Sequence, residues 1–170
     1  YSMRRESFDA ALRAADLYRS LGDDHRRYSA LMCVAAQGMR FGSLEEMEWA
    51  IAEATRLVRS DWPVLLRAIL AYARCWWYAR LGRHEEALVC AQQQVEINRE
   101  GGEPVREQYA VSNVTAVELL LGRPEAALKH ARAAIVRLDA LGARAGAGHL
   151  FTNAMIALIL LNRLDEAVAA

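Results

Sequence analysis

Apolar residues recur at spacings of three and four along most of the chain. One such stripe consists of Leu66, Leu70, Ala73, Trp77 and Leu81. Because an α-helix turns once in about 3.6 residues, this spacing places the stripe on one face of an amphipathic helix. No segment shows the strict alternation of a half-buried strand. The pattern therefore predicts an all-α protein with helices over residues 5–21, 24–41, 44–59, 63–81, 84–100, 104–121, 124–141, 145–161 and 164–170.

Four short stretches recur at a spacing of 40 residues and mark boundaries between helices. They read FGSLEEM at 41–47, LGRHEEA at 81–87, LGRPEAA at 121–127 and LNRLDEA at 161–167. In each stretch an apolar residue precedes Gly or Asn, which tolerates the left-handed backbone that ends a helix. Acidic residues follow, where the dipole of a new helix favours negative charge. Further breakers at 61–63, 101–104 and 142 divide each period into two helices.

The stretch LGRHEEALVCA at 81–91, its copies, and Tyr78 four residues before Gly82 resemble the tetratricopeptide repeat. The usual repeat has about 34 residues, and the small glycine of its first helix is replaced here by Ala35, Cys75, Thr115 and Met155. The longer period is similar to that of the tetratricopeptide-like regions of MalT-like, LuxR-type bacterial activators and related signalling proteins. The resemblance implies a right-handed superhelical solenoid of antiparallel helix pairs, with about four repeats and a partial one at each end.

We expect residues 1–170 to form one repeat domain. Its last full helix reads AMIALILL at 154–161 and is apolar on every side, whereas repeat arrays normally end in a polar capping helix. We therefore expect the chain to be a fragment of a longer protein. The isolated piece is expected to form a homodimer through this exposed end.

In such repeats the first helix of each pair lines a groove that binds partners. Adjacent helical residues point roughly 100° apart, so Trp76, Trp77 and Tyr78 cannot share one face. The repeat register places Tyr78 between paired helices, Trp77 between repeats and Trp76 on the groove. The expected groove residues are Met32, Met39, Tyr72, Trp76, Tyr109, Asn113, His149 and Asn153. Methionine and aromatic side chains there favour a partner helix or peptide.

Asn113 and Asn153 lie one repeat apart. In some tetratricopeptide proteins, asparagines at this position bond the backbone of an extended peptide, because an amide offers donors and an acceptor.

Two charges also interrupt the apolar pattern. Arg74 and Glu118 occupy core positions on first helices of adjacent repeats, which predicts an inter-repeat ion pair; the alternative is that each side chain reaches solvent separately.

Charge, cysteine content and the lack of long apolar runs limit the partners and the compartment that fit the sequence. Lys+Arg and Asp+Glu number 21 each, so no net field attracts this segment to nucleic acid or to an anionic membrane. Cys33, Cys75 and Cys90 show no CxxC spacing and are expected to be buried, reduced thiols. The first residues lack the apolar region of a signal peptide, and no apolar run reaches the ~18 residues of a membrane span. A cytoplasmic protein is expected.

No catalytic or cofactor-binding pattern is present. His84–Leu88 begins like HExxH but has Leu88 in place of the second ligand, and the glycine-rich 142–148 has no preceding strand, so it is interpreted as a flexible link. We therefore expect no enzyme, metal or cofactor.

The expected function is a protein-interaction and regulatory module of a larger bacterial regulator. Its groove would bind a peptide, a helix or another domain of the parent chain. The alternative is a sensor domain of a transcriptional activator that binds a small inducer. A closed pocket near Tyr72, Trp76 and Asn113 favours the sensor, whereas an open continuous trough favours a peptide or helix.

Overall fold

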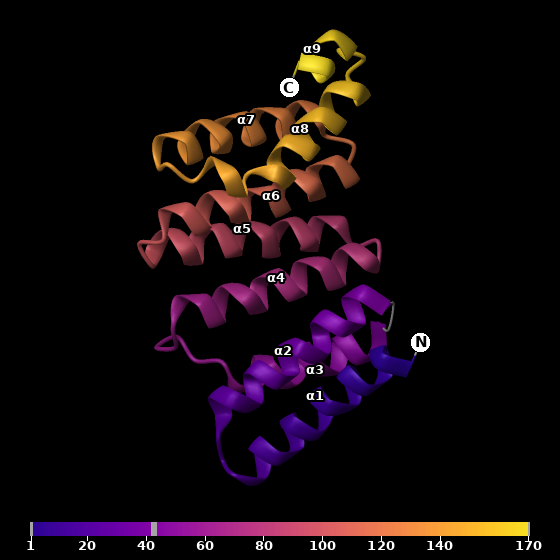
Figure 1. Cartoon of the computed structure of the whole chain (residues 1–170), viewed down its shortest axis with the longest axis vertical. Coiled ribbons are helices and arrows are strands. Elements are labelled where there is room, and N and C mark those ends of the chain that lie inside the picture. The colour runs from indigo at the N-terminus through magenta and orange to yellow at the C-terminus, as the bar shows by residue number, and fades with distance from the viewer. Residues whose placement is uncertain (1, 42–43, 170) are drawn as a thin grey trace.

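The computed structural model describes residues 2–41 and 44–169, and all regular elements within these residues are helical. The elements are α1 Ser2–Ser20, α2 Asp24–Phe41, α3 Leu44–Leu57, α4 Val64–Arg80, α5 His84–Glu100, α6 Pro104–Leu120, α7 Pro124–Ala140, the short 3-10 helix η1 Arg144–Gly146, α8 Gly148–Leu160 and α9 Leu164–Ala169. Each α-helix packs against the next one along the chain, from α1 at one end of the stack to α9 at the other (Figure 1). The all-α prediction is confirmed. None of the described helices is long and apolar enough to cross a membrane.

Helices α4, α5, α6 and α7 each contain 17 residues, and each joins the next through the same three-residue turn. Gly82 and Gly122 have φ of 73° and 68°, and Asn162 has φ of 56°. After α4, Gly82 N–H donates to Ala79 O at 3.1 Å and Arg83 N–H donates to Tyr78 O at 3.0 Å. These two bonds define a Schellman motif, which closes a helix with a left-handed residue. The predicted helix stops at positions 82, 122 and 162 are confirmed, and Gly42 lies outside the described residues.

The connection between α3 and α4 departs from this turn. Its position 62 carries a tryptophan, and Trp62 is buried against His25 and Tyr28 at ring-centroid distances of 4.2 and 5.4 Å. The Tyr28 hydroxyl donates to Leu66 O at the start of α4, and burial raises the pKa of this phenol. The aromatic cluster therefore fixes α4 on α2 where the usual glycine turn is missing.

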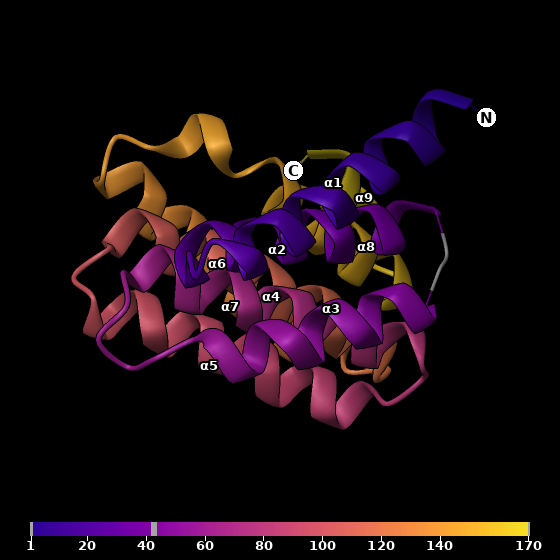
Figure 2. The same ribbon diagram turned by 90° about the horizontal axis from the view of Figure 1, so that it is seen from below.

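The core has three parts that follow the order of the helices. One lies within α1–α4, one between α4, α5 and α6, and one between α6, α7 and α8. Trp77 packs on the first part, toward the preceding repeat, and Tyr78 packs on the second, between the paired helices α4 and α5. Both placements agree with the repeat register. Seen from below, α3 and α5 lie on one side of the stack and α2 and α8 on the other (Figure 2).

Two expectations need correction. Cys33 is exposed, while Cys75 and Cys90 are buried. The inward stripe of α2 contains Tyr28, Leu31 and Val34, and position 33 falls outside it. The helix expected from residue 145 begins at Gly148 instead, because residues 144–146 form the 3-10 helix η1.

Candidate functional site

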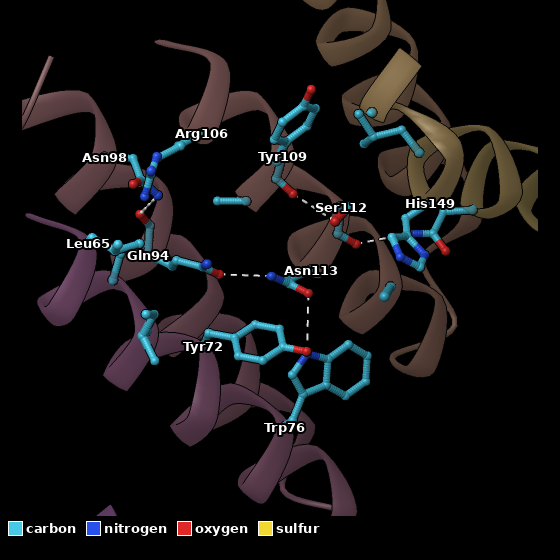
Figure 3. Close-up of a pocket in the computed structure, with 17 residues that line it drawn as sticks. Leu65, Tyr72, Trp76, Gln94, Asn98, Arg106, Tyr109, Ser112, Asn113 and His149 are labelled. Carbon is cyan, nitrogen blue, oxygen red and sulfur yellow. Dashed lines mark hydrogen bonds between the residues drawn. The ribbon is translucent and has the colours of Figure 1, made fainter. Parts of the chain in front are cut away.

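Helices α4, α6 and α8 together form what we call the first-helix face, because each is the first helix of its pair. A cavity of about 750 Å³ lies on this face (Figure 3). Six of the eight predicted groove residues line it: Tyr72, Trp76, Tyr109, Asn113, His149 and Asn153. Apolar residues complete much of the wall, among them Leu65, Ala68, Ile69, Ala110, Ala116 and Leu150.

A chain of side-chain hydrogen bonds holds one wall of the cavity together. Trp76 Nε1–H donates to Asn113 Oδ1 at 3.3 Å, and Asn113 Nδ2–H donates to Gln94 Oε1 at 2.8 Å (Figure 3). The Tyr72 and Trp76 rings meet edge to face at a centroid distance of 6.5 Å. Because the three polar side chains come from α4, α6 and α5, the chain fixes the indole and both amides across three helices.

Asn153 joins α8 to α6. Its Nδ2 donates to Ser112 O at 2.9 Å and to Thr115 Oγ1 at 2.8 Å. Both hydrogens of this amide are therefore taken by the neighbouring helix. In the free chain, the two asparagines predicted to hold a peptide backbone thus bond to neighbouring helices and line the cavity.

The turn before α8 forms part of the rim. The Tyr109 hydroxyl donates to Ala143 O at 3.1 Å, and Gly146 lies directly against the same ring. Ala147 is fully buried, and the Arg144 guanidinium lies 5.1 Å from the centroid of the Phe151 ring. The glycine-rich stretch, interpreted from sequence as a flexible link, thus contains the 3-10 helix η1 and contacts the rest of the protein at Ala143, Gly146 and Ala147.

The charge distribution around the cavity is one-sided. Of the 17 described residues that line it, none is Asp or Glu, whereas Arg106 and His149 stand exposed at its rim. Arg106 has only a loose contact of 3.6 Å with Glu103, in which both side chains are about half exposed. Leu65, Arg106 and His149 are second or third residues of α4, α6 and α8, which all begin at the same edge of the stack (Figure 1). The positive ends of these three helix dipoles lie at this edge, together with the negative ends of α5 and α7, which run in the opposite direction (Figure 1).

Met32 and Met39 are half-buried and pack on the core of α1–α4, so they do not line the cavity. Met39 Sδ accepts a long hydrogen bond of 3.8 Å from the Tyr72 hydroxyl. Of the expected groove residues, six therefore line the cavity and two pack on the N-terminal core.

The predicted ion pair between Arg74 and Glu118 is replaced by two other contacts. Arg74 Nη2 donates to Thr55 Oγ1 on α3 at 2.9 Å. Glu118 is buried, and its carboxylate lies 2.9 Å from His130 Nδ1 on α7. Arg74 on α4 therefore bonds to the preceding helix α3, and Glu118 on α6 contacts the following helix α7. The two charged side chains do not pair with each other.

Gln94, Asn98 and Arg106 line the cavity but were not among the expected groove residues. The repeat register assigns the groove to first helices, whereas Gln94 and Asn98 belong to the second helix α5. Their four-residue spacing, which places both on one helix face, was the available signal. Within the described residues, no group of three or more His, Cys, Asp or Glu side chains is arranged to hold a metal ion.

Comparisons with known proteins add no assignment. No protein-family model matches the chain, and no curated protein matches its sequence. The tetratricopeptide-like family remains a prediction from the repeated residues.

Proposed function

We propose that this chain is a recognition module whose cavity on the first-helix face binds a small organic ligand. The observation that carries the proposal is the convergence of Tyr72, Trp76 and Asn113 on one half-open cavity. Small-molecule sites typically have volumes of about 300–1,000 Å³, apolar walls and a few placed polar groups. A cavity of about 750 Å³ with aromatic and amide side chains fits this class.

The hydrogen-bonded walls favour binding without large rearrangement. Trp76, Asn113 and Gln94 are already held by one another, and Asn153 is held by α6. A ligand that enters such a site orders few additional side chains, which lowers the entropic cost of binding. The ligand would contact three consecutive helix pairs and so favour one stacking geometry over others. In a tetratricopeptide-like, right-handed superhelix of a bacterial regulator, this would transmit the signal to other domains.

The second candidate is a peptide or helix that lies along the first-helix face. The contact between Tyr72 and Met39 favours it, because it joins the edge of the cavity to the half-buried side chains of α2. The hydrogen bonds that Asn113 and Asn153 already make within the protein count against a ladder of amides to a peptide backbone.

Equilibrium dialysis of the chain against a metabolite extract and a peptide library, with mass spectrometry of retained compounds, tests the proposal. Ala116 lines the cavity and is half-buried, so Ala116→Phe would fill part of it. The matched control is Ala133→Phe, which adds the same side chain at an exposed position of α7 outside the cavity.

We expect small compounds that the wild type and Ala133→Phe retain and that Ala116→Phe loses. Peptides with this pattern would support the second candidate instead. If the Ala116→Phe protein, folded by circular dichroism, retains the same compounds as the wild type, the cavity is not the binding site and the proposal is wrong.

A further inference from the structure

The cavity extends along the helix axes, and different residues line its two ends. Leu65, Arg106 and His149 lie at the edge where the three helices begin, and Trp76 and Ala116 lie farther along α4 and α6. From Leu65 to Trp76 the rise along α4 is roughly 16 Å. A ligand that spans the cavity would therefore meet different chemistry at its two ends.

The edge where the helices begin favours negative charge. Arg106 carries a permanent positive charge, and a histidine always offers at least one N–H donor. No acidic side chain is among the described lining residues, and the nearest carboxylate to Arg106 is that of Glu103, 3.6 Å from its Nε. An anionic group at this edge would therefore be attracted, whereas a cationic group would be repelled.

The middle and far parts of the cavity favour an apolar, ring-bearing body. Tyr72 and Trp76 meet edge to face, and the Tyr109 ring is held against Gly146. The indole N–H of Trp76 and the side-chain carbonyl oxygen of Asn113 already bond to each other. A ligand therefore need not supply a hydrogen bond to either group. Aromatic side chains present flat apolar surfaces on which ligand rings pack well.

We infer that the ligand class is an elongated organic acid, with a carboxylate at the Arg106–His149 edge and an aromatic body that reaches toward Tyr72 and Trp76. This inference rests on the proposed function and names the chemistry of its ligand. A carboxylate at this edge would accept charge-assisted hydrogen bonds from the Arg106 guanidinium, and His149 is a second donor on the other side of the cavity (Figure 3). An uncharged or cationic analogue with the same body would lose these charge-assisted bonds.

The test uses three matched probes: biphenyl-4-acetate, biphenyl-4-acetamide and 2-(biphenyl-4-yl)ethylamine. Dissociation constants are measured by ligand-observed NMR titration with the wild type and with Arg106→Gln, His149→Gln and Trp76→Ala. The charge-matched control is Arg13→Gln, since Arg13 is an exposed residue of α1 outside the cavity. A peptide with a C-terminal phenylalanine also presents a carboxylate close to an aromatic ring, and it distinguishes a peptide end from a small acid.

We expect the carboxylate to bind about tenfold more tightly than the amide, and the amine to bind most weakly. Arg106→Gln and His149→Gln should each reduce this preference, and added salt should weaken the carboxylate alone. Trp76→Ala should weaken all three probes, and Arg13→Gln none.

Equal binding of the carboxylate and the amide, with both lost in Trp76→Ala, would overturn the acid preference while leaving the cavity as a ligand site. Absence of binding by the carboxylate at millimolar concentration would overturn the inference, and the dialysis experiment would still decide the proposed function. Tighter binding of the peptide than of biphenyl-4-acetate would overturn the assignment to a small acid.

Discussion

The phenol ring of Tyr109 lies directly against the backbone of Gly146. A Cβ atom at position 146 would come within 2.2 Å of the Tyr109 hydroxyl oxygen, and that hydroxyl donates to Ala143 O at 3.1 Å. The missing side chain of one residue thus makes room for the ring of another, 37 positions earlier in the chain. Because Tyr109 lines the cavity, the turn before α8 and the cavity wall depend on each other.

Gly146→Ala should therefore displace Tyr109 and destabilise the protein. Overpacking of this kind typically costs about 1–3 kcal/mol in the free energy of unfolding. The measurement is urea unfolding followed by far-UV circular dichroism. In a Tyr109→Ala background the same substitution should cost much less, because the obstructing ring is gone. An equal cost in both backgrounds would show that the Tyr109 ring is not the obstruction.

The turns after α6 and α8 predict different effects on stability for Gly122→Ala and Asn162→Gly. Gly122 has a φ of 68° and no atom near its added Cβ, so Gly122→Ala should cost about 1–2 kcal/mol through backbone conformation alone. Asn162→Gly should leave stability unchanged or raise it by less than about 1 kcal/mol, since glycine adopts the φ of 56° without strain.

Gly148→Ala is the control for these turn variants. Gly148 also has free space around its added Cβ, but it lacks a positive φ. It lies at the start of α8, where alanine is a better helix former. Urea unfolding should show no loss of stability for Gly148→Ala. If Gly122→Ala is equally harmless, the left-handed turn does not limit stability.

The positions of the helices could be predicted from the sequence because local chemistry sets them. Gly82, Gly122 and Asn162 end helices through their own backbone preferences, and the apolar stripes between them report on one helix at a time. All predicted α-helix boundaries, including the start of α8, fall within three residues of the observed ones. Six of the eight groove residues expected from the repeat register line the cavity, since equivalent positions on stacked first helices face the same side.

The remaining features depend on contacts between helices that periodicity does not encode. Glu118 could pair with a neighbour on either side, and only the packing of α6 on α7 brings His130 to its carboxylate. Met39 has the register of a groove residue, yet the different α3–α4 turn leaves it on the N-terminal core. Gln94 lies on a second helix, and its contact with Asn113 depends on how α5 packs against α6. The apolar stripe of a single helix carries no information about that packing.

The three cysteines should differ sharply in their reactivity with iodoacetamide. Cys33 is exposed, whereas burial, and secondarily the nearby Cys90 thiol, raises the pKa of Cys75 to about 12. Burial also raises the pKa of Cys90. Because the thiolate is the reactive form, native protein at pH 8 should be alkylated at Cys33 while Cys75 and Cys90 stay protected.

Peptide mass spectrometry over time measures this difference, with urea-denatured protein as the control in which all three cysteines react. A Cys33→Ser variant should remain unmodified under native conditions. Labelling of Cys75 at the rate of Cys33 would contradict the packing between α4 and α5.

The separate partners of Arg74 and Glu118 predict the outcome of two double-mutant cycles. Arg74 bonds to Thr55, and Glu118 contacts His130, so the first two residues share no partner. The cost of Arg74→Ala and the cost of Glu118→Ala should therefore add to within about 0.5 kcal/mol. For Glu118 and His130, which are in contact, the coupling should be about 1 kcal/mol, because the half-exposed imidazole is partly screened by solvent.

The single variants in the second cycle should also be informative. His130→Ala leaves the carboxylate of Glu118 buried without this partner and should cost about 1–3 kcal/mol in urea unfolding. Lys129→Ala, at the exposed neighbouring position of α7, is the matched control and should change stability by less than about 0.5 kcal/mol. A coupling above about 1 kcal/mol between Arg74 and Glu118 would restore the ion pair expected from the sequence. Absence of coupling between Glu118 and His130 would show that their contact adds nothing to the packing of α6 on α7.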